Sequence, residues 1–197
     1  MNVVLASASP TRAALLRAAG VAFEIDPAAV DEEAVKQSLL AEGTAPHAIA
    51  GALAELKAIR VSQRRPDDMV IGADLVLEFE GRLVSKSESL ADARALLLEL
   101  RGKRHALHCA AALAKAGAPV WRHGAKAALW MRAFSADCLD AYLARHGESL
   151  LGGVGCYRIE DDGIQLFERI DGDYFAILGL PLLPLLNALR EHSLLVR

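Results

Sequence analysis

Residues 5–16 have the sequence LASASPTRAALL, in which a short apolar segment passes into an amphipathic segment through a turn rich in serine. Two valines precede Leu5 and complete a β-prone run, which predicts a strand. Ser9 is a favourable N-cap, and Pro10 suits the first helical position because its missing N–H group would have no helical partner there. The stretch therefore predicts a strand, a tight turn and a helix from Pro10 to a C-cap at Gly20, which is the opening of an α/β fold.

The turn at residues 7–12, here named the serine turn, has the chemistry of a phosphate-binding site. The N–H groups and the dipole at a helix start favour an anion, the Ser7 and Ser9 hydroxyls are donors, and Arg12 adds a full positive charge. We therefore expect a di- or triphosphate to bind here. The same pattern is compatible with structure alone, with Ser9 as a simple cap and Arg12 as a surface charge, so other parts of the chain must decide.

Composition narrows the class of protein. With 197 residues, 53% of them hydrophobic, and no linker or repeat, the chain predicts a single globular domain over residues 1–197, built as one body or as two lobes that share a sheet. The net charge of −3 and the scattered basic residues argue against a nucleic-acid polymer as partner. The sequence shows neither a signal peptide nor an apolar run of about 20 residues, so we expect a cytoplasmic protein that does not bind membranes. Its three cysteines lack CxxC spacing, which predicts reduced thiols.

The order of expected elements indicates a mixed α/β fold. Helices are expected at residues 46–61, 90–100, 136–145 and from 181 to about 191, with a short one at 164–170 and an acidic loop or helix start at 31–33. Strands are expected at 22–25, 69–73, 156–159 and 174–178, with hairpins at 76–84 and 104–131. We expect these strands to form a sheet flanked by helices.

Asp74 is the strongest catalytic candidate in the chain. It follows the apolar residues VIGA, at the expected end of a strand and next to a glycine that lets another group approach closely. Lys57 and Lys86 are candidates to balance the charge of a triphosphate, and Asp31 and Glu32 are candidates to hold a divalent ion. For each of the two lysines, a solvated surface position is the alternative.

A zinc site at His105, His108 and Cys109 is disfavoured. Positions three apart on a strand face opposite sides of the sheet, so the two histidines would not share one ion. The same objection applies to a nucleophilic Cys-His pair, and the chain has no Gly-x-Ser-x-Gly motif.

Several short motifs occur in a fixed order: SASPTR at 7–12, the pair Asp31-Glu32, LAELKA at 53–58, IGAD at 71–74, Lys86 and IDGDYFAILGLPLLPLL at 170–186. In this arrangement the chain resembles the Maf family of nucleoside triphosphate pyrophosphatases over nearly its full length. The resemblance implies a mixed α/β fold related to inosine triphosphatase, with two lobes around a deep cleft and often a homodimer. It also implies hydrolysis of a nucleoside triphosphate to the monophosphate and pyrophosphate, aided by Mg²⁺ or Mn²⁺.

The resemblance also assigns roles to residues. Asp74 falls at the position of the catalytic base. The substrate's phosphates would contact Ser7, Ser9, Arg12, Lys57 and Lys86, and the metal would be held by Asp31, Glu32 and Asp74.

Three positions bear on the preferred base. The branch of the family that acts on dTTP and UTP has arginine, threonine and glutamine where this chain has Thr11, Leu75 and Glu160. The segment YRIE at 157–160 is instead similar to the branch associated with 7-methyl-GTP, and a carboxylate can accept hydrogen bonds from the guanine N1–H and N2–H₂ edge. We therefore expect a modified purine as substrate, with dTTP or UTP as the alternative.

Other departures from the family pattern keep further alternatives open. Gly152 and Gly153 stand where the family usually has lysine and alanine, and Ser87 stands where proline usually follows Lys86. Loss of that lysine removes a cation from the expected site and lowers the expected activity. A nucleotide-binding regulator with little turnover and an unrelated α/β domain are therefore the alternatives to an enzyme.

Overall fold

A computed structural model describes residues 1–196, which fall into two compact units. Unit 1 consists of Met1–Leu75, His108–Lys126 and the residues from Asp173 onward, and unit 2 of Val76–Leu107 and Ala127–Gly172. Three strands pass through both units. In the described part of the chain no helix combines the length and the apolar character needed to cross a membrane.

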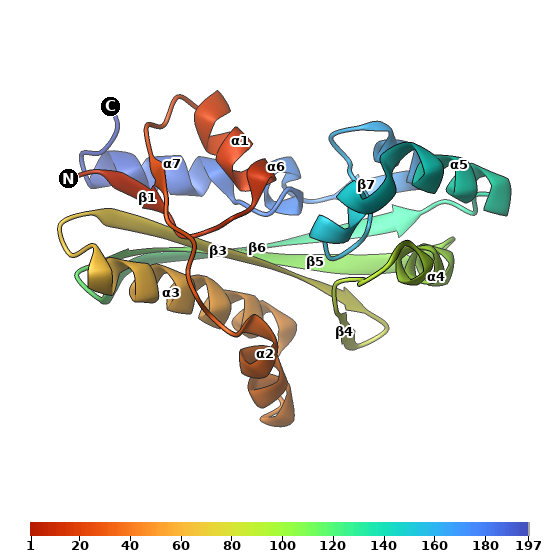
Figure 1. The fold of residues 1–197 in the computed structure, drawn as a ribbon, viewed down its shortest axis with the longest axis horizontal. Coiled ribbons are helices and arrows are strands. Elements are labelled where there is room, and N and C mark those ends of the chain that lie inside the picture. Colours follow the sequence, from red (N-terminus) through yellow and green to blue (C-terminus); the bar gives the residue numbers. More distant parts are fainter. Residues whose placement is uncertain (197) are drawn as a thin grey trace. The chain divides into compact units, whose positions relative to one another are not determined.

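The elements form the mixed α/β fold expected from the sequence (Figure 1). The helices of unit 1 are α1 (Pro10–Ala18), α2 (Glu32–Ala41), α3 (Pro46–Arg64), α6 (Tyr174–Ile177) and α7 (Leu182–Glu191). Unit 2 contains α4 (Leu90–Leu100), α5 (Ala136–His146) and the 3₁₀ helices η1 (Gly147–Gly152) and η2 (Asp162–Leu166). The strands are β1 (Val3–Leu5), β2 (Glu24–Ile25), β3 (Met69–Phe79), β4 (Arg82–Val84), β5 (Arg104–Lys115), β6 (Ala118–Met131) and β7 (Phe167–Asp171).

These strands make one mixed sheet in the order β2-β1-β3-β5-β6-β7, with β4 paired to β3. In unit 1, β1 runs parallel to both β2 and β3. In unit 2, β4 is antiparallel to the end of β3, and β7 is antiparallel to the end of β6. The expected hairpins at 76–84 and 104–131 are therefore confirmed.

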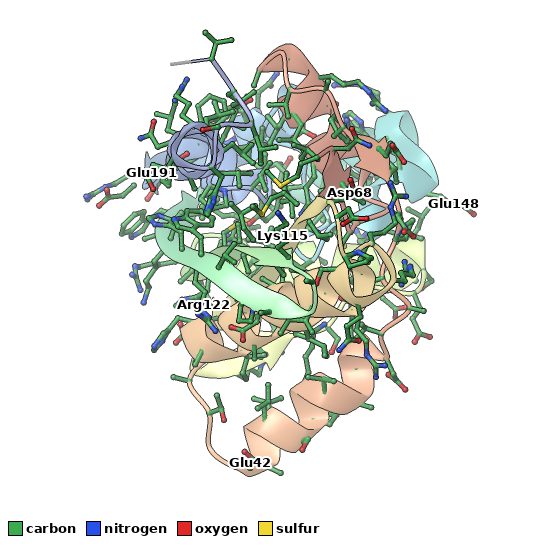
Figure 2. All side chains as sticks on the ribbon, turned by 90° about the vertical axis from the view of Figure 1, so that its left-hand side faces the viewer. Glu42, Asp68, Lys115, Arg122, Glu148 and Glu191 are labelled. Atoms are coloured by element: carbon green, nitrogen blue, oxygen red, sulfur yellow. The ribbon has the colours of Figure 1, made fainter. Side chains whose placement is uncertain are left out.

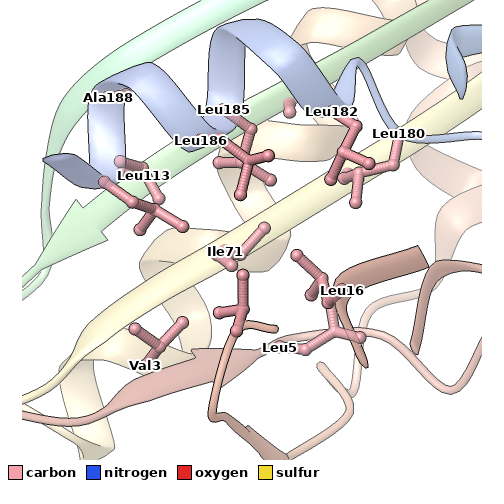
Figure 3. Packing of buried hydrophobic residues seen from close by; sticks show 14 of the residues in the cluster. Val3, Leu5, Leu16, Ile71, Leu113, Leu180, Leu182, Leu185, Leu186 and Ala188 are labelled. Atoms are coloured by element: carbon pink, nitrogen blue, oxygen red, sulfur yellow. The ribbon is translucent and has the colours of Figure 1, made fainter. Parts of the chain in front are cut away.

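Alternation along the strands of unit 1 divides its core between two faces of the sheet. Leu5 and Ile71 pack on the face covered by α1 and α7, where they meet Leu16 and Leu185 (Figures 1 and 3). Val4 and Val70 point to the opposite face and pack against Val61 of α3, and a further cluster on that face joins α3 to β5. Because side chains alternate along a strand, Asp74 shares the α3 face with Val70.

The strand expected to end at Asp74 continues to Phe79, so Asp74 lies within β3. Residues 75–79 continue the β-prone pattern, and the strand exchanges its parallel pairing with β1 for antiparallel pairing with β4. The expected strand at 174–178 is wrong: residues 174–177 form α6. Asp173 caps this helix, since its Oδ1 atom accepts hydrogen bonds from the N–H groups of Phe175 and Ala176.

Two expectations in unit 2 are also wrong. Residues 156–159 form no strand, because Cys156 has a left-handed backbone with φ +54° that turns the chain. The helix expected at 164–170 is instead the end of η2 followed by β7, whose residues pair with β6. Pairing across the sheet outweighs the local helical pattern there.

Candidate active site

The parallel strands β1 and β2 end at one edge of the parallel part of the sheet, at Leu5 and Ile25, whereas β3 continues beyond it to Phe79. Leu5 is in register with Ile71 across β1 and β3. Ser7 follows β1 at this edge, Asp74 lies three residues beyond Ile71, and Glu32 begins the helix that follows β2. Ligand sites of open α/β sheets form at this edge, so the topology gathers the candidates that lay far apart in the sequence.

The serine turn is held by its own hydrogen bonds. The Ser9 Oγ atom accepts a hydrogen bond from the N–H group of Arg12 at 3.3 Å, which confirms Ser9 as the cap of α1. The buried Ser7 hydroxyl accepts two hydrogen bonds, from the Ser9 N–H group at 3.2 Å and from Arg12 Nη1 at 3.0 Å. Arg12 Nε also donates to the carbonyl of Gly179 at 2.8 Å. Arg12 is therefore a fixed cation, and its reading as a solvated surface charge is wrong.

Lys57 and Asp74 form a buried ion pair. The Nζ atom of Lys57 lies 2.7 Å from Asp74 Oδ1, and each side chain is only 6% exposed. The same Nζ atom lies 2.8 Å from Glu32 Oε1. The second oxygen of Asp74, Oδ2, is buried and has no hydrogen-bond partner within residues 1–196. One lysine thus gathers two carboxylates, and Asp74 keeps one acceptor oxygen for a ligand.

Gly72 makes this contact possible. A Cβ atom at Gly72 would lie 2.1 Å from the Ala54 carbonyl oxygen and 2.6 Å from the Ala58 nitrogen. The backbone of α3 therefore packs directly on β3 at this glycine, and Lys57, in the same turn of α3, reaches Asp74 two residues further along the strand. The expectation that a glycine beside Asp74 admits a close neighbour is confirmed.

The two acidic residues at the start of α2, Asp31 and Glu32, make different contacts. Asp31 is the N-cap of α2, with its Oδ1 atom accepting a hydrogen bond from Ala34 N–H at 3.0 Å, whereas Glu32 reaches Lys57. No residue of α2 itself is buried, and Figure 2 shows Glu42 at the outer end of this helix. The Glu32–Lys57 contact thus anchors an otherwise exposed helix at its first turn.

Cys109 lies near the same charges without the properties of a nucleophile. Its thiol is buried, which raises its pKa to about 12, while the Arg12 charge acts in the opposite direction and the charges of Asp74 and Asp173 add to the rise. The Cys109 thiol therefore interacts electrostatically with both Arg12 and Asp74. A thiol with so high a pKa stays protonated and serves packing.

Two candidate specificity residues, Thr11 and Leu75, lie in unit 1 and are partly buried. Lys86 and Glu160 belong to unit 2, and both are exposed. Glu160 Oε1 lies 3.4 Å from Arg158, which also donates a hydrogen bond to Asp161.

The loop after Lys86 is fastened within unit 2. Ser87 accepts a hydrogen bond from the Cys156 thiol at 3.2 Å, so the segments that carry Lys86 and Glu160 meet within this unit. Gly152 ends η1, and a Cβ atom at Gly152 or at its neighbour Gly153 would have open space around it.

The two histidines of β5 lie in separate surroundings. His105 hydrogen-bonds the Tyr157 hydroxyl at 2.9 Å, and burial lowers its pKa to about 4. The His108 ring lies 6.4 Å from the ring of His47 in unit 1. Across residues 1–196, no group of three or more histidine, cysteine, aspartate or glutamate side chains is placed to hold a metal ion.

Sequence reasoning missed the ion pair itself and the part played by Gly179. The pair had a signal: Lys57 stands inside the apolar stripe of α3, and Asp74 stands inside an apolar strand, so both patterns bury a charge. Buried opposite charges need a partner, which makes each the natural partner of the other. The contact of Gly179 with Arg12 had no such signal, because it is made by a backbone carbonyl, and side-chain patterns do not indicate which carbonyl an arginine will meet.

The Maf-like protein family matches residues 2–192 of the chain. Proteins named nucleoside triphosphate pyrophosphatase from Granulibacter bethesdensis and Caulobacter vibrioides are 53% and 54% identical to it, covering 99% and 98% of this chain and 99% and 96% of their own. A protein named 7-methyl-GTP pyrophosphatase from Rhizobium meliloti is 47% identical, over 96% of this chain and 95% of its own. By the family match over residues 2–192 and the full-length similarity to these relatives, the chain belongs to the Maf-like protein family.

Proposed function

We propose that this protein hydrolyses a nucleoside triphosphate to the monophosphate and pyrophosphate. The observation that carries the proposal is the Asp74 carboxylate, fixed through one oxygen by Lys57 while the other has no hydrogen-bond partner in the described chain. β1, which leads into the serine turn, pairs in parallel with β3, which carries Asp74, and Leu5 is in register with Ile71. The assignment is supported by relatives of 53% and 54% sequence identity, which bear the name nucleoside triphosphate pyrophosphatase. The three unpaired cysteines suit a reducing, cytoplasmic setting.

In this mechanism Asp74 is the general base. Its Oδ2 atom takes a proton from a water molecule, whose oxygen forms a bond to the α-phosphorus. The bond from that phosphorus to the oxygen bridging the α and β phosphates breaks, and pyrophosphate leaves with the electron pair. Arg12 and the hydroxyls of Ser7 and Ser9 donate hydrogen bonds to the phosphate oxygens.

A divalent cation fits the carboxylates of unit 1. Glu32 and Asp74 both contact Lys57 Nζ and so lie close together, and carboxylate oxygens are ligands of the kind that Mg²⁺ and Mn²⁺ prefer. Two carboxylates together with substrate phosphate oxygens match how Mg²⁺ is usually held in phosphoryl-transfer sites. Asp31 would add only its Oδ2 atom, because its Oδ1 atom caps α2. When bound, the cation supplies charge neutralisation on the phosphates.

We propose a guanine nucleotide, with 7-methyl-GTP as the favoured case, as substrate. Glu160 supplies a carboxylate that can accept from the N1–H and N2–H₂ groups of guanine, and Arg158 at 3.4 Å orients it. The Rhizobium meliloti relative bears the name 7-methyl-GTP pyrophosphatase, whereas others bear only the general name. Thymine and uracil present a carbonyl to the same carboxylate, which disfavours dTTP and UTP.

The test is pyrophosphate release with Mg²⁺ or Mn²⁺ from dTTP, UTP, CTP, GTP, ATP and 7-methyl-GTP. Asp74→Asn should abolish release while triphosphate binding persists, because the amide cannot accept the proton. Asp68→Asn is the matched control: Asp68 precedes β3 at the opposite end of the strand and bonds Asn2 and Arg65, so release should stay within about threefold.

The panel separates the alternatives. Preference for dTTP or UTP would keep the enzyme and overturn the guanine assignment. Binding without release in the unmodified protein would point to a nucleotide-binding regulator and overturn the proposal.

A further inference from the structure

The guanidinium of Arg12 is bonded to a backbone group 167 positions away in the chain. Arg12 Nε donates to the Gly179 carbonyl at 2.8 Å, and Arg12 Nη1 donates to Ser7 Oγ at 3.0 Å. Two contacts made by different nitrogens of the guanidinium fix both its position and its rotation. Three of its five N–H donors then stay available for a ligand.

The carbonyl of Gly179 is itself held by a rigid turn. Asp173 Oδ1 accepts hydrogen bonds from Phe175 N–H at 2.6 Å and from Ala176 N–H at 3.1 Å, which starts α6. The Gly179 N–H group donates to the Ala176 carbonyl at 2.9 Å and closes the turn. Gly179 has φ +92°, a conformation that L side chains rarely adopt.

A side chain at Gly179 would also meet Arg12 directly. A Cβ atom built there lies 3.3 Å from Arg12 Nε and 3.5 Å from Arg12 Nη2. The position thus needs glycine twice, once for its backbone angle and once for the space that the guanidinium occupies.

Ser7 completes the arrangement. Its Oγ atom accepts hydrogen bonds from the Ser9 N–H group and from Arg12 Nη1, which uses both lone pairs. The hydroxyl can therefore act toward a ligand only as a donor, beside the donors of Arg12.

We propose that Gly179 is a positioning residue for the triphosphate: its carbonyl sets the Arg12 guanidinium so that Arg12 and Ser7 donate to the same phosphate group. This inference rests on the proposed function, which makes the serine turn the phosphate site. It extends the site to the turn formed by residues 173–179, which acts through Arg12 and without touching the substrate.

The experiment is a double-mutant cycle read by the Kd of α,β-methylene-GTP, an analogue that cannot be cleaved between the α and β phosphates. Gly179→Ala should raise this Kd about tenfold, as should Arg12→Lys, since each costs one well-placed hydrogen bond to a charged group. In the Arg12→Lys background, Gly179→Ala should change Kd less than about twofold, because the guanidinium that it displaces is already gone.

Gly20→Ala is the matched control. Gly20 lies in the same unit after α1, has φ +72° and has no atom within 4 Å of a built Cβ, so it shares the backbone strain without the arginine contact. Both glycine variants should lower Tm, but Gly20→Ala should leave Kd within about twofold.

Two results would overturn the inference. One is an unchanged Kd in Gly179→Ala. The other is a rise of Kd on Gly179→Ala that is as large in the Arg12→Lys background as in the protein that retains Arg12. Pyrophosphate release by the unmodified protein is measured separately across the same panel of nucleotides. Its absence with every nucleotide would overturn the proposed function, while the Kd cycle still decides the role of Gly179.

Discussion

Lys57 Nζ lies 2.7 Å from Asp74 Oδ1, in a contact that joins a helix and a strand through two side chains that are each 6% exposed. The attraction between the two charges is what permits a carboxylate to stay in the interior of unit 1. The same contact leaves Asp74 Oδ2 without a hydrogen-bond partner in the described chain, and this is the oxygen that we propose as the general base.

Removal of Lys57 tests how much the ion pair with Asp74 contributes to the stability of the fold. Lys57→Met keeps the aliphatic volume but leaves the Asp74 charge buried without compensation, so the free energy of unfolding should fall by about 3–5 kcal/mol. Asp74→Asn in the same background should restore part of the loss, because the uncompensated charge is gone. Urea unfolding at neutral pH measures both, and a Lys57→Met protein as stable as the unmodified one would contradict this role of the pair.

Gly72→Ala tests the close approach of α3 to β3. The added methyl group would collide with backbone atoms of Ala54 and Ala58, which cannot move aside as a side chain can. We expect a loss of about 1–3 kcal/mol in stability together with a loss of pyrophosphate release, because Lys57 is displaced from Asp74. Gly51→Ala, in α3 with open space around its Cβ, should instead be neutral or stabilising by up to about 1 kcal/mol. Equal stability losses in the two variants would argue against a specific contact.

Glu160→Gln tests whether Glu160 recognises the nucleobase of the substrate. The amide keeps one acceptor but sets an NH₂ group against the donors of guanine, so kcat/KM for guanine triphosphates should fall at least about tenfold relative to that for UTP. Glu168→Gln, an exposed change of the same kind on β7, serves as control and should leave the ratio of the two substrates unaltered. A ratio that does not move in Glu160→Gln would remove Glu160 from base recognition.

His105 predicts a pH dependence of stability. Burial lowers its pKa from 6.5 to about 4, so the unfolded chain binds a proton at a higher pH than the folded protein does. The free energy of unfolding is therefore unaffected by His105 above about pH 6.5 and decreases as the pH falls from there toward 4. The expected decrease is about 2 kcal/mol by pH 5. His105→Gln retains an amide that can bond Tyr157 and cannot titrate, so its urea unfolding should lack this decline. A parallel decline in both proteins would assign the effect to other groups.

Local signals in the sequence predicted the parts of the site that are built locally. Ser9 and Pro10 define the start of α1 by capping and by φ, and the structure has the helix beginning there. Asp74 is predicted because it follows an apolar run that contains a glycine, although the strand does not end there as expected. Residues 174–177, by contrast, form a helix through a cap at Asp173 that overrides their β-prone composition.

Contacts between segments far apart in the chain could not be predicted from local sequence patterns. The continuation of β3 past Asp74 depends on pairing with β4, and the contact of Lys57 with two carboxylates depends on the packing of α3 at Gly72. Arg12 is predicted as a cation at the helix start, but its partner is a backbone carbonyl 167 positions away, which no local pattern around Arg12 indicates.

The bond between Arg12 and Gly179 also bears on how the protein is made. Unit 1 draws on the early, middle and late parts of the chain, so the residues of the serine turn leave the ribosome long before the partner of Arg12 has been synthesised. Until Gly179 emerges, the arginine has no carbonyl to hold it, and translation has to pass that codon before the site is complete.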